Sequence, residues 1–322
     1  MDEAMGAEKF HAFEDLSNAE ILVTGGTGFI GRHLIGRLLS LGAQVTIVDR
    51  TTRVNLFEPS RHLTTYTLSL PDSSIVDLIK QDRFTAVFHL AGPSSVPSSI
   101  QNPADDLFFN AHATLQILEA IRHHSLETRL IYMASAAVYG NPDHLPVAET
   151  TPLHPISPYG ISKLATEMYI SLYARLHGLQ TASLRPFSIY GPGQKKLVVY
   201  DLIQKLQTNP DRIEVYGTGE EVRDFLYVDD MVAAAIMVMI RGDLKGEAYN
   251  VASGHGTVIR DIVGILTSTI KLSPQICYTG KGRPGDPAKW IADISKLAGL
   301  GFRPTVNLKD GLKQVVRWYD SL

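Results

Sequence analysis

The sequence has few cysteines, no excess of basic residues and no long apolar run. Cys277 is the single cysteine among 322 residues, which excludes a disulfide framework and a zinc site built from cysteine thiolates. Thirty lysines and arginines stand against 33 aspartates and glutamates, so the net charge is −3 and no nucleic-acid partner is predicted. No apolar run reaches the roughly 18 residues that a membrane span needs, so we predict no membrane association.

The chain nevertheless has ample material for a buried core. Hydrophobic residues make up 44% of it and charged residues 20%, which is typical of an enzyme-sized globular protein. Residues 1–19 contain no apolar run of signal-peptide length, and we predict that they form an accessory leader. The expected location is the cytoplasm.

Short apolar runs alternate with helical periodicity from residue 20 onward. The predicted strands are Ile21–Thr24, Gln44–Asp49, Thr64–Leu68, Ala86–Leu90, Arg129–Ala134 and Thr181–Arg185. The predicted helices are Phe29–Leu41, Ser73–Gln81, Pro103–His124 and Ser157–His177. This alternation predicts an α/β fold with a doubly wound parallel sheet, in which ligands bind at the carboxyl edge of the strands.

The regular alternation of strand and helix patterns ends after Pro186, where Gly, Pro and Lys residues cluster. We predict a smaller C-terminal lobe with shorter, less regular strands and helices. A helix at 228–240 and a strand at 248–251 are expected to return to the main sheet. The predicted division is therefore a leader (1–19), a sheet domain (20–187 plus about 228–252) and a substrate lobe (188–227 plus 253–322).

A glycine-rich turn follows directly after the first predicted strand. Gly25 permits a tight turn, Gly28 lets the backbone approach a diphosphate, and Gly31 allows close packing of the following helix. The helix N-terminus would offer free N–H groups to the anion. Asp49 follows Gly31 by 18 positions and would bind both ribose hydroxyls, which favours NAD over NADP, although the adjacent Arg50 suits a 2′-phosphate. A turn that merely connects strand and helix is the alternative.

Several motifs occur in one order along the chain. They are Gly25–Gly31, Val87–Gly92, Asn110, Met133–Gly140, Tyr159–Lys163, Arg185–Ser188, Val222–Phe225, Tyr249–Val251 and Arg283–Asp286. With these motifs, nearly the whole chain from Glu20 onward resembles the extended short-chain dehydrogenase/reductases of the nucleotide-sugar epimerase/dehydratase group, which have a Rossmann domain and bind NAD.

Tyr159 and Lys163 are four residues apart on a predicted helix and so share one face. A neighbouring ammonium and the positive nicotinamide would favour the phenolate of Tyr159, which could then remove a hydroxyl proton. Ser135 ends the fifth predicted strand and could bridge Tyr159 and a substrate oxygen. An ordinary amphipathic helix is the alternative, and the resemblance favours catalysis. The expected cofactor contacts are Gly25, Thr27, Gly28, Phe29, Ile30, Gly31, Asp49, Arg50, Leu90, Ala91, Gly92, Tyr159 and Lys163.

The resemblance also implies a nucleotide-sugar substrate, with UDP as the usual carrier. Arg223 and Arg283 are then the expected diphosphate clamps, because guanidinium groups bind phosphate oxygens bidentately. Asp286 matches the family position that binds the nucleotide ribose. The expected contacts near the sugar are Ser95, Val96, Ser135 and Ser188, the last standing where the family usually has Asn. No histidine pair has metal-ligand context, so no metal site is predicted.

The reaction is left open between related outcomes. Ala136 and Ala137 replace the Asp-Glu pair usual in nucleotide-sugar 4,6-dehydratases, which favours a 4-epimerase acting on a UDP-hexose or UDP-N-acetylhexosamine. The short Lys195–Val199 segment resembles the dehydratases instead, so an unconventional elimination across C5–C6 is the rival. A non-catalytic NAD-binding regulator is a third alternative. Trp290 falls where the family tunes the space near the sugar C2 substituent. A homodimer through the long helices 103–124 and 157–177 is expected.

Overall fold

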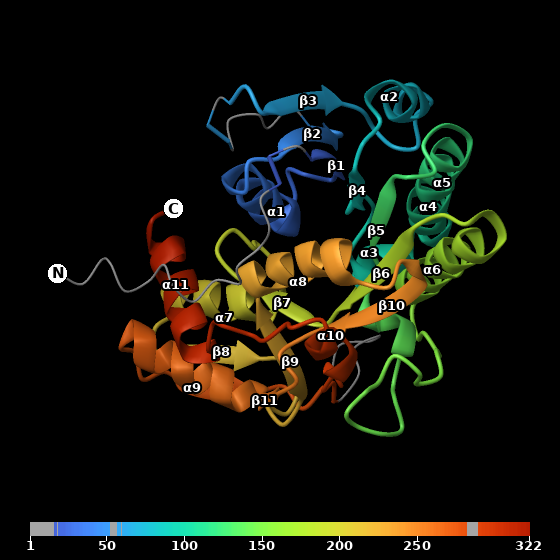
Figure 1. Cartoon of the computed structure of the whole chain (residues 1–322). Helices are drawn as coiled ribbons and strands as arrows, with labels where there is room; N and C mark the ends of the chain where they lie inside the picture. The colour runs from blue at the N-terminus through green and yellow to red at the C-terminus, as the bar shows by residue number, and fades with distance from the viewer. Residues whose placement is uncertain (1–15, 18, 52–56, 59, 282–288) are drawn as a thin grey trace.

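The computed structural model describes residues 16–17, 19–51, 57–58, 60–281 and 289–322 (Figure 1). Most of the predicted leader lies outside the described residues. So do Arg283 and Asp286, the second expected diphosphate clamp and the expected ribose contact. Their predicted roles therefore remain expectations.

A seven-stranded parallel sheet forms the centre of the molecule, in the order β10-β6-β5-β4-β1-β2-β3. Its strands are β1 (Glu20–Thr24), β2 (Gln44–Asp49), β3 (Leu63–Thr67), β4 (Ala86–His89), β5 (Arg129–Met133), β6 (Thr181–Pro186) and β10 (Lys245–Val251). Apolar side chains on both faces of the inner strands are buried, as a parallel sheet requires. The order reverses beside β1, as in a doubly wound Rossmann fold, so the predicted fold class is confirmed.

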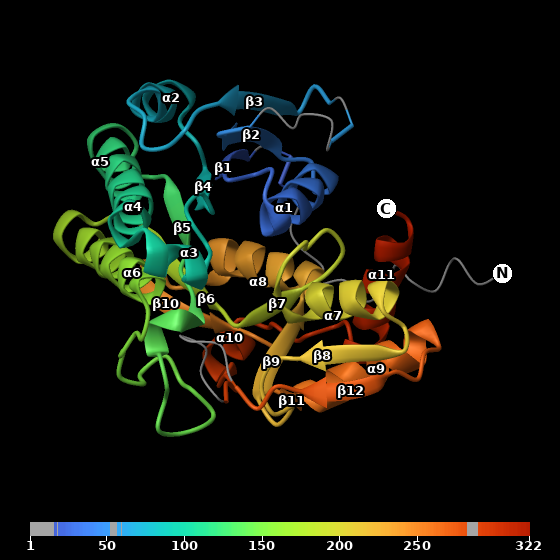
Figure 2. The same cartoon turned by 180° about the vertical axis from the view of Figure 1, so that it is seen from behind.

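Helices cover both faces of this sheet (Figures 1 and 2). On one face α1 (Phe29–Ser40) packs beside α8 (Val228–Arg241). On the other face α5 (Ala113–His124) packs between α2 (Ser74–Asp82) and α6 (Pro158–His177). Helix α8 is buried along most of its length because it contacts the central sheet and the strands of the C-terminal lobe.

The C-terminal lobe contains two small sheets and several helices. One sheet joins β7 (Ser188–Tyr190), β9 (Val222–Tyr227) and β11 (Gly256–Val258), and the other pairs β8 (Arg212–Val215) with β12 (Gln275–Tyr278). The helices are α7 (Leu197–Thr208), α9 (Ile259–Ile270), α10 (Ser295–Gly299) and α11 (Leu308–Asp320). The expectation of shorter helices is wrong for α7 and α9, which have 12 residues each, as α1 does. Their apolar faces pack on one another and form the core of the lobe.

The predicted single helix 103–124 is interrupted. It consists of α4 (Pro103–Leu107), a π-helical turn at Phe108–His112 and α5. The turn contains neither proline nor glycine, so its sequence reads as ordinary helix. A π turn adds one residue and rotates the helix face, and such insertions are frequent at functional sites.

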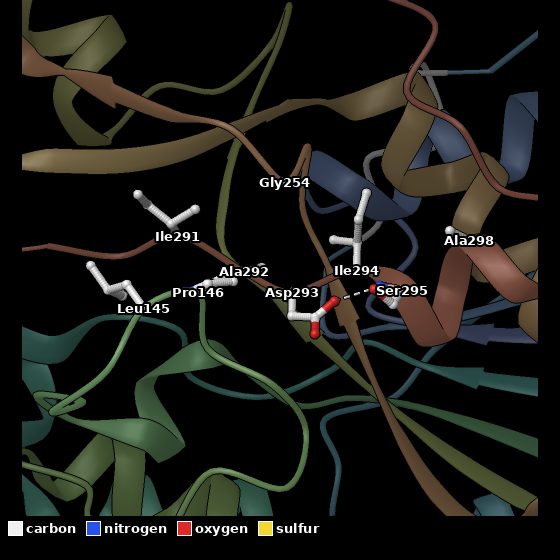
Figure 3. Close-up of a pocket in the computed structure, with 9 residues that line it drawn as sticks. All are labelled: Leu145, Pro146, Gly254, Ile291, Ala292, Asp293, Ile294, Ser295 and Ala298. Carbon is white, nitrogen blue, oxygen red and sulfur yellow. Dashed lines mark hydrogen bonds between the residues drawn. The ribbon is translucent and has the colours of Figure 1, made fainter.

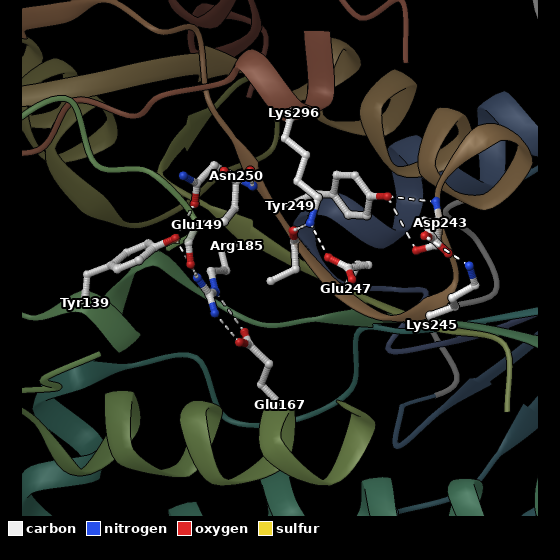
Figure 4. A network of polar contacts seen from close by, with 11 residues as sticks. Tyr139, Glu149, Glu167, Arg185, Asp243, Lys245, Glu247, Tyr249, Asn250 and Lys296 are labelled. Atoms are coloured by element: carbon white, nitrogen blue, oxygen red, sulfur yellow. Dashed lines mark hydrogen bonds and ion pairs between the residues drawn. The ribbon is translucent and has the colours of Figure 1, made fainter. Parts of the chain in front are cut away.

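A buried polar network fixes β6 and β10 to the segment that follows β5 (Figure 4). The guanidinium of Arg185 on β6 donates to both carboxylate oxygens of Glu167 on α6, and to the Tyr139 hydroxyl. That hydroxyl donates to Asn250 Oδ1 on β10 at 2.7 Å. The Arg185 and Glu167 side chains are only 5% and 8% exposed, so their charges are compensated within the protein.

Candidate active site

The glycine turn between β1 and α1 is shaped to receive an anion. Gly25 has φ +71°, and a Cβ there would lie 2.7 Å from the main-chain nitrogen of Ala91. A Cβ on Gly31 would lie 2.5 Å from the Gly25 carbonyl oxygen. Helix α1 begins after the exposed Gly28 with no side-chain cap and no acidic residue in its first turn. Its N–H groups therefore remain available to a diphosphate.

Asp49 ends β2 directly beside this turn. Its Oδ2 accepts hydrogen bonds from the main-chain N–H and the hydroxyl of Thr27, at 3.0 and 2.8 Å. The carboxylate is thus held directly beside the turn at which a dinucleotide is expected to bind. Arg50 follows it and is exposed. A carboxylate in this place fits NAD and would repel a 2′-phosphate.

The segment after β4 lies against the same turn. Gly92 has φ +137°, and a Cβ there would lie 2.5 Å from Asn110 Oδ1 in the π turn. Asn110 donates from Nδ2 to the carbonyls of Asp106 and Pro93, at 3.0 and 3.4 Å. It therefore joins the helical segment to the segment that follows β4. His89 is a hydrogen-bonded core residue, and burial lowers its pKa to about 3.

Ser135, Tyr159 and Lys163 meet beyond the carboxyl end of β5. Ser157 caps α6 by accepting from the N–H of Gly160, and the helix then presents Tyr159 and Lys163 one turn apart. The Ser135 hydroxyl lies close enough to the Tyr159 phenol to lower its pKa. The buried Lys163 donates from Nζ to the Met133 carbonyl at 2.9 Å. The three expected catalytic groups therefore form one cluster.

The electrostatics of this cluster differ from the expectation. Burial raises the pKa of Tyr159 above its usual range, the interaction with the Ser135 hydroxyl opposes that increase, and the charge of Asp106 adds to it. Lys163 Nζ donates to a carbonyl and lies 5.9 Å from the centroid of the Tyr159 ring. Burial lowers the pKa of Lys163 itself to about 8.

The serine-rich loop after β4 reaches the same cluster. Ser95 caps α3 (Val96–Gln101), and the Ser99 hydroxyl accepts from the main-chain N–H of Tyr159 at 3.1 Å. From the opposite lobe, Lys196 Nζ donates to the Ser94 hydroxyl at 2.9 Å. The expected contacts near the sugar include Ser95 and Val96 of this loop, but neither Ser99 nor Lys196. The run of serines was the available signal for Ser99.

The expected substrate contacts on the lobe lie on its three-stranded sheet. Ser188 on β7 pairs with β9, which carries the half-buried Arg223. Lys289 forms a β-bridge with Val222, the residue before Arg223. Trp290 donates from its indole to the Gly140 carbonyl at 3.2 Å and packs edge-on against Phe187. The indole of Trp290 therefore packs between the C-terminal lobe and the segment that follows β5.

A separate hollow of about 480 Å³ lies between the segment at Leu145–Pro146 and the segment at 291–298 (Figure 3). It is lined by Leu145, Pro146, Gly254, Ile291, Ala292, Asp293, Ile294, Ser295 and Ala298. Most of these side chains are apolar, and none belongs to the glycine turn or to the Ser135 cluster. The glycine turn and the Ser135, Tyr159 and Lys163 cluster lie elsewhere, at the carboxyl edge of the main sheet.

Comparison with known proteins decides the family. Residues 21–252 match the family model described as "NAD dependent epimerase/dehydratase family". The chain belongs to this family. It is accordingly an NAD-dependent enzyme, and the glycine turn with Asp49 provides a site that fits NAD.

Solved structures show which members it is similar to. The UDP-glucose 4-epimerase of Thermotoga maritima, solved with UDP-glucose, is 34% identical with a TM-score of 0.86, over 94% of this chain and 99% of that one. The UDP-N-acetylglucosamine 4-epimerase of Methanobrevibacter ruminantium is 29% identical with a TM-score of 0.87, over 96% and 99%. The dTDP-glucose 4,6-dehydratase DesIV of Streptomyces venezuelae, solved with NAD bound, is 27% identical with a TM-score of 0.85, over 94% and 97%.

Two further observations concern the described part of the chain. Within it, no helix has the length and apolar character needed to cross a membrane. Across the same residues, no three His, Cys, Asp or Glu side chains gather as ligands for a metal ion.

Proposed function

We propose that this protein is a nucleotide-sugar 4-epimerase that acts on a UDP-hexose or a UDP-N-acetylhexosamine. The observation that carries the proposal is the Ser135, Tyr159 and Lys163 cluster combined with alanine at positions 136 and 137. Ala136 is fully buried and neither alanine can donate or accept a proton. The cluster therefore has the groups for oxidation and re-reduction but lacks the usual acid/base pair for elimination.

The proposed chemistry needs few protein groups. Tyr159 takes the proton of the C4 hydroxyl and later returns it, while the Ser135 hydroxyl orients the same oxygen. The Gly25–Gly31 turn and Asp49 would hold NAD, which would supply the hydride acceptor for C4 and the hydride donor for its re-reduction on the opposite face. Lys163 supplies a buried positive charge beside Tyr159. Because the hydride is returned within each cycle, turnover should need no added oxidant.

The proposed substrate lobe comprises residues 188–227 and 253–322. Arg223 and Arg283 are proposed to clamp the diphosphate, with Asp286 on the nucleotide ribose and Ser188 nearby. The β-bridge of Lys289 beside Arg223 supports this, since residue 289 follows the Arg283–Asp286 motif closely in the chain. Ser95 and Val96 are proposed to face the sugar from the loop that holds Tyr159.

An unconventional dehydratase is the second candidate. Lys196 and Leu197 occupy the short segment that resembles the dehydratases, and Lys196 reaches across to Ser94 beside the cluster. Leu197 has φ +70°, which is unfavourable for a leucine and marks a constrained segment at the edge of the proposed site. Such a segment could present an alternative proton donor to C6.

Mass spectrometry separates the two reactions. UDP-glucose, UDP-N-acetylglucosamine and dTDP-glucose would each be incubated with the purified enzyme. We expect an isomer of unchanged mass, resolved from the substrate by chromatography. A product lighter by one water would establish the dehydratase, and no change of any substrate would refute both candidates.

Truncation of Arg223 to alanine tests the diphosphate clamp. Loss of one charge-assisted hydrogen bond, about 1.5 to 3 kcal/mol, should weaken nucleotide-sugar binding roughly 10- to 150-fold. NAD affinity should stay within about twofold of the wild type, because its diphosphate belongs to the Gly25–Gly31 turn. Both ligands would be titrated by calorimetry, with exposed Arg212 truncated to alanine as the control. If NAD binds more weakly and nucleotide-sugar binding is unchanged, Arg223 contacts the diphosphate of NAD and the proposed clamp is wrong.

A homodimer is proposed through the helical side of the main domain. Exposed apolar side chains gather there on α6 and the preceding π turn, namely Phe108, Phe109, Ile161, Met168, Tyr169 and Leu176. Such side chains are typical of a subunit interface. Light scattering should give twice the chain mass for the wild type and a monomer for Met168→Glu. Leu322→Glu, an equally exposed position at the end of the lobe, should remain dimeric. A monomeric wild type would exclude the interface.

A further inference from the structure

Asp106 is a buried carboxylate that no step of the proposed reaction uses. It lies on α4 and is only 3% exposed, whereas the preceding Asp105 is exposed. Neither Oδ1 nor Oδ2 of Asp106 has a hydrogen-bond partner within the described protein. Buried carboxylates normally accept several hydrogen bonds, because an uncompensated buried charge is strongly unfavourable. Its presence here therefore requires a specific explanation.

The surroundings of Asp106 belong to the catalytic cluster. Helix α4 packs against α6, which carries Tyr159 and Lys163, and against α3, which has no titratable side chain. Asp106 acts electrostatically on these two groups and on the buried Tyr132 of β5. Glu167, also on α6, forms its ion pair with Arg185. Of the three groups whose pKa Asp106 affects, Lys163 is the one that is positively charged when protonated, so it is the group that the carboxylate can stabilise as an ion.

The π turn strengthens this placement. His112, its titratable member, stacks on Phe108. Asn110, one turn after Asp106, is also buried and has an unpartnered Oδ1, beside Gly92 of the cofactor loop. Two buried acceptors thus occur in one helical segment that departs from α-helical geometry at the proposed site. This combination is typical of a functional constraint.

Lys163 is a buried cation without an ion-pair partner within hydrogen-bond distance among the described residues. It is only 4% exposed, and its Nζ donates to a neutral carbonyl. Burial lowers its pKa to about 8, and the charge of Asp106 opposes that decrease. A buried ammonium is retained in proteins where a negative charge compensates it.

We propose that Asp106 is a positioning residue whose buried carboxylate keeps the Lys163 ammonium charged and in place beside Tyr159. The inference rests on the proposed function of Tyr159 and Lys163. It assigns Asp106 no contact with substrate: the carboxylate acts through the lysine.

The variant Asp106→Asn removes the charge and preserves the shape of the side chain. Asp106 raises the pKa of both Lys163 and Tyr159, so its removal lowers both. Tyr159 would then ionise, and Lys163 would lose its proton, at lower pH. The whole bell-shaped profile of kcat should therefore move to lower pH. The ratio of kcat at about pH 9 to kcat at about pH 6.5 should fall roughly tenfold.

Asp105→Asn is the matched control, since it removes the same charge from the next, exposed position of the same helix. Its pH profile should superimpose on that of the wild type. A general effect of charge at the start of α4 would move both profiles equally, and a purely structural role of Asp106 would lower kcat at every pH without moving the profile. Either result would overturn the proposal.

Direct titration of Lys163 tests the inference without turnover. Lysines labelled with ¹³C at the ε position would be followed by NMR, with Lys163→Met to assign the signal. We expect Lys163 to be charged at pH 7 in the wild type and to titrate at lower pH in Asp106→Asn. A neutral Lys163 in the wild type refutes the proposal even if the variant does not fold. Normal turnover with an unchanged Lys163 titration refutes Asp106 alone, whereas a shifted titration without activity on any nucleotide sugar refutes the proposed function alone.

Discussion

Replacement of Tyr159 by phenylalanine is expected to lower turnover about 100- to 10,000-fold, the range typical for loss of a general acid–base group. The substitution removes one oxygen from a helix whose cap at Ser157 and whose anchor at Ser99 involve other atoms. The fold and NAD binding should therefore be preserved. Steady-state kinetics on the substrate found by mass spectrometry, together with NAD titration, would measure the two effects separately.

Tyr169→Phe is the control for this experiment. Tyr169 lies further along the same helix, in the proposed dimer interface and outside the Ser135 cluster. Because the variant keeps its aromatic ring there, it should retain full activity. If Tyr159→Phe also remains within a few-fold of the wild type, Tyr159 is not the acid–base group. If it loses NAD affinity as strongly as activity, its role lies in cofactor binding.

The main features of the fold followed from local sequence patterns. The predicted ends of six strands of the central sheet agree with the structure to within one residue, whereas β10 begins at Lys245, three residues before its predicted start. The glycine turn could be interpreted because it lies between a strand and a helix, where glycine has a steric purpose. Tyr159 and Lys163 could be paired because a helix places residues four apart on one face. Each of these inferences depends on a few neighbouring residues.

The features that escaped prediction depend on contacts between distant segments. Phe108–His112 has the composition of an α-helix, but it forms a π turn between α4 and α5, both of which pack on α6. Asp106 follows another aspartate and reads as part of a solvated surface, because sequence alone does not show which of the two is buried. The raised pKa of Tyr159 likewise comes from burial, which depends on the assembled structure.

Removal of the charge from Glu167 is expected to cause the largest loss of stability. The Glu167→Gln variant would leave the Arg185 guanidinium buried opposite a neutral amide. Burial opposes the charged form of Arg185, but its hydrogen bonds and the charge of Glu167 raise its pKa overall. Breaking a buried ion pair in this way costs about 3 to 5 kcal/mol, a large part of the about 5 to 15 kcal/mol that stabilises a typical protein. Urea unfolding should show the loss as a lower midpoint.

An exposed pair of the same kind provides the comparison. Arg260 and Glu220 also form an arginine–glutamate ion pair, but their side chains are 58% and 61% exposed, so Glu220→Gln should cost less than about 1 kcal/mol. A double variant, Glu167→Leu with Arg185→Met, removes both buried charges and should be more stable than Glu167→Gln alone. If Glu167→Gln is no less stable than Glu220→Gln, burial does not determine the strength of this pair. If the double variant is the least stable of all, the hydrogen bonds of Arg185 to Tyr139 and the Glu149 carbonyl hold β6 in place more than the charge pair does.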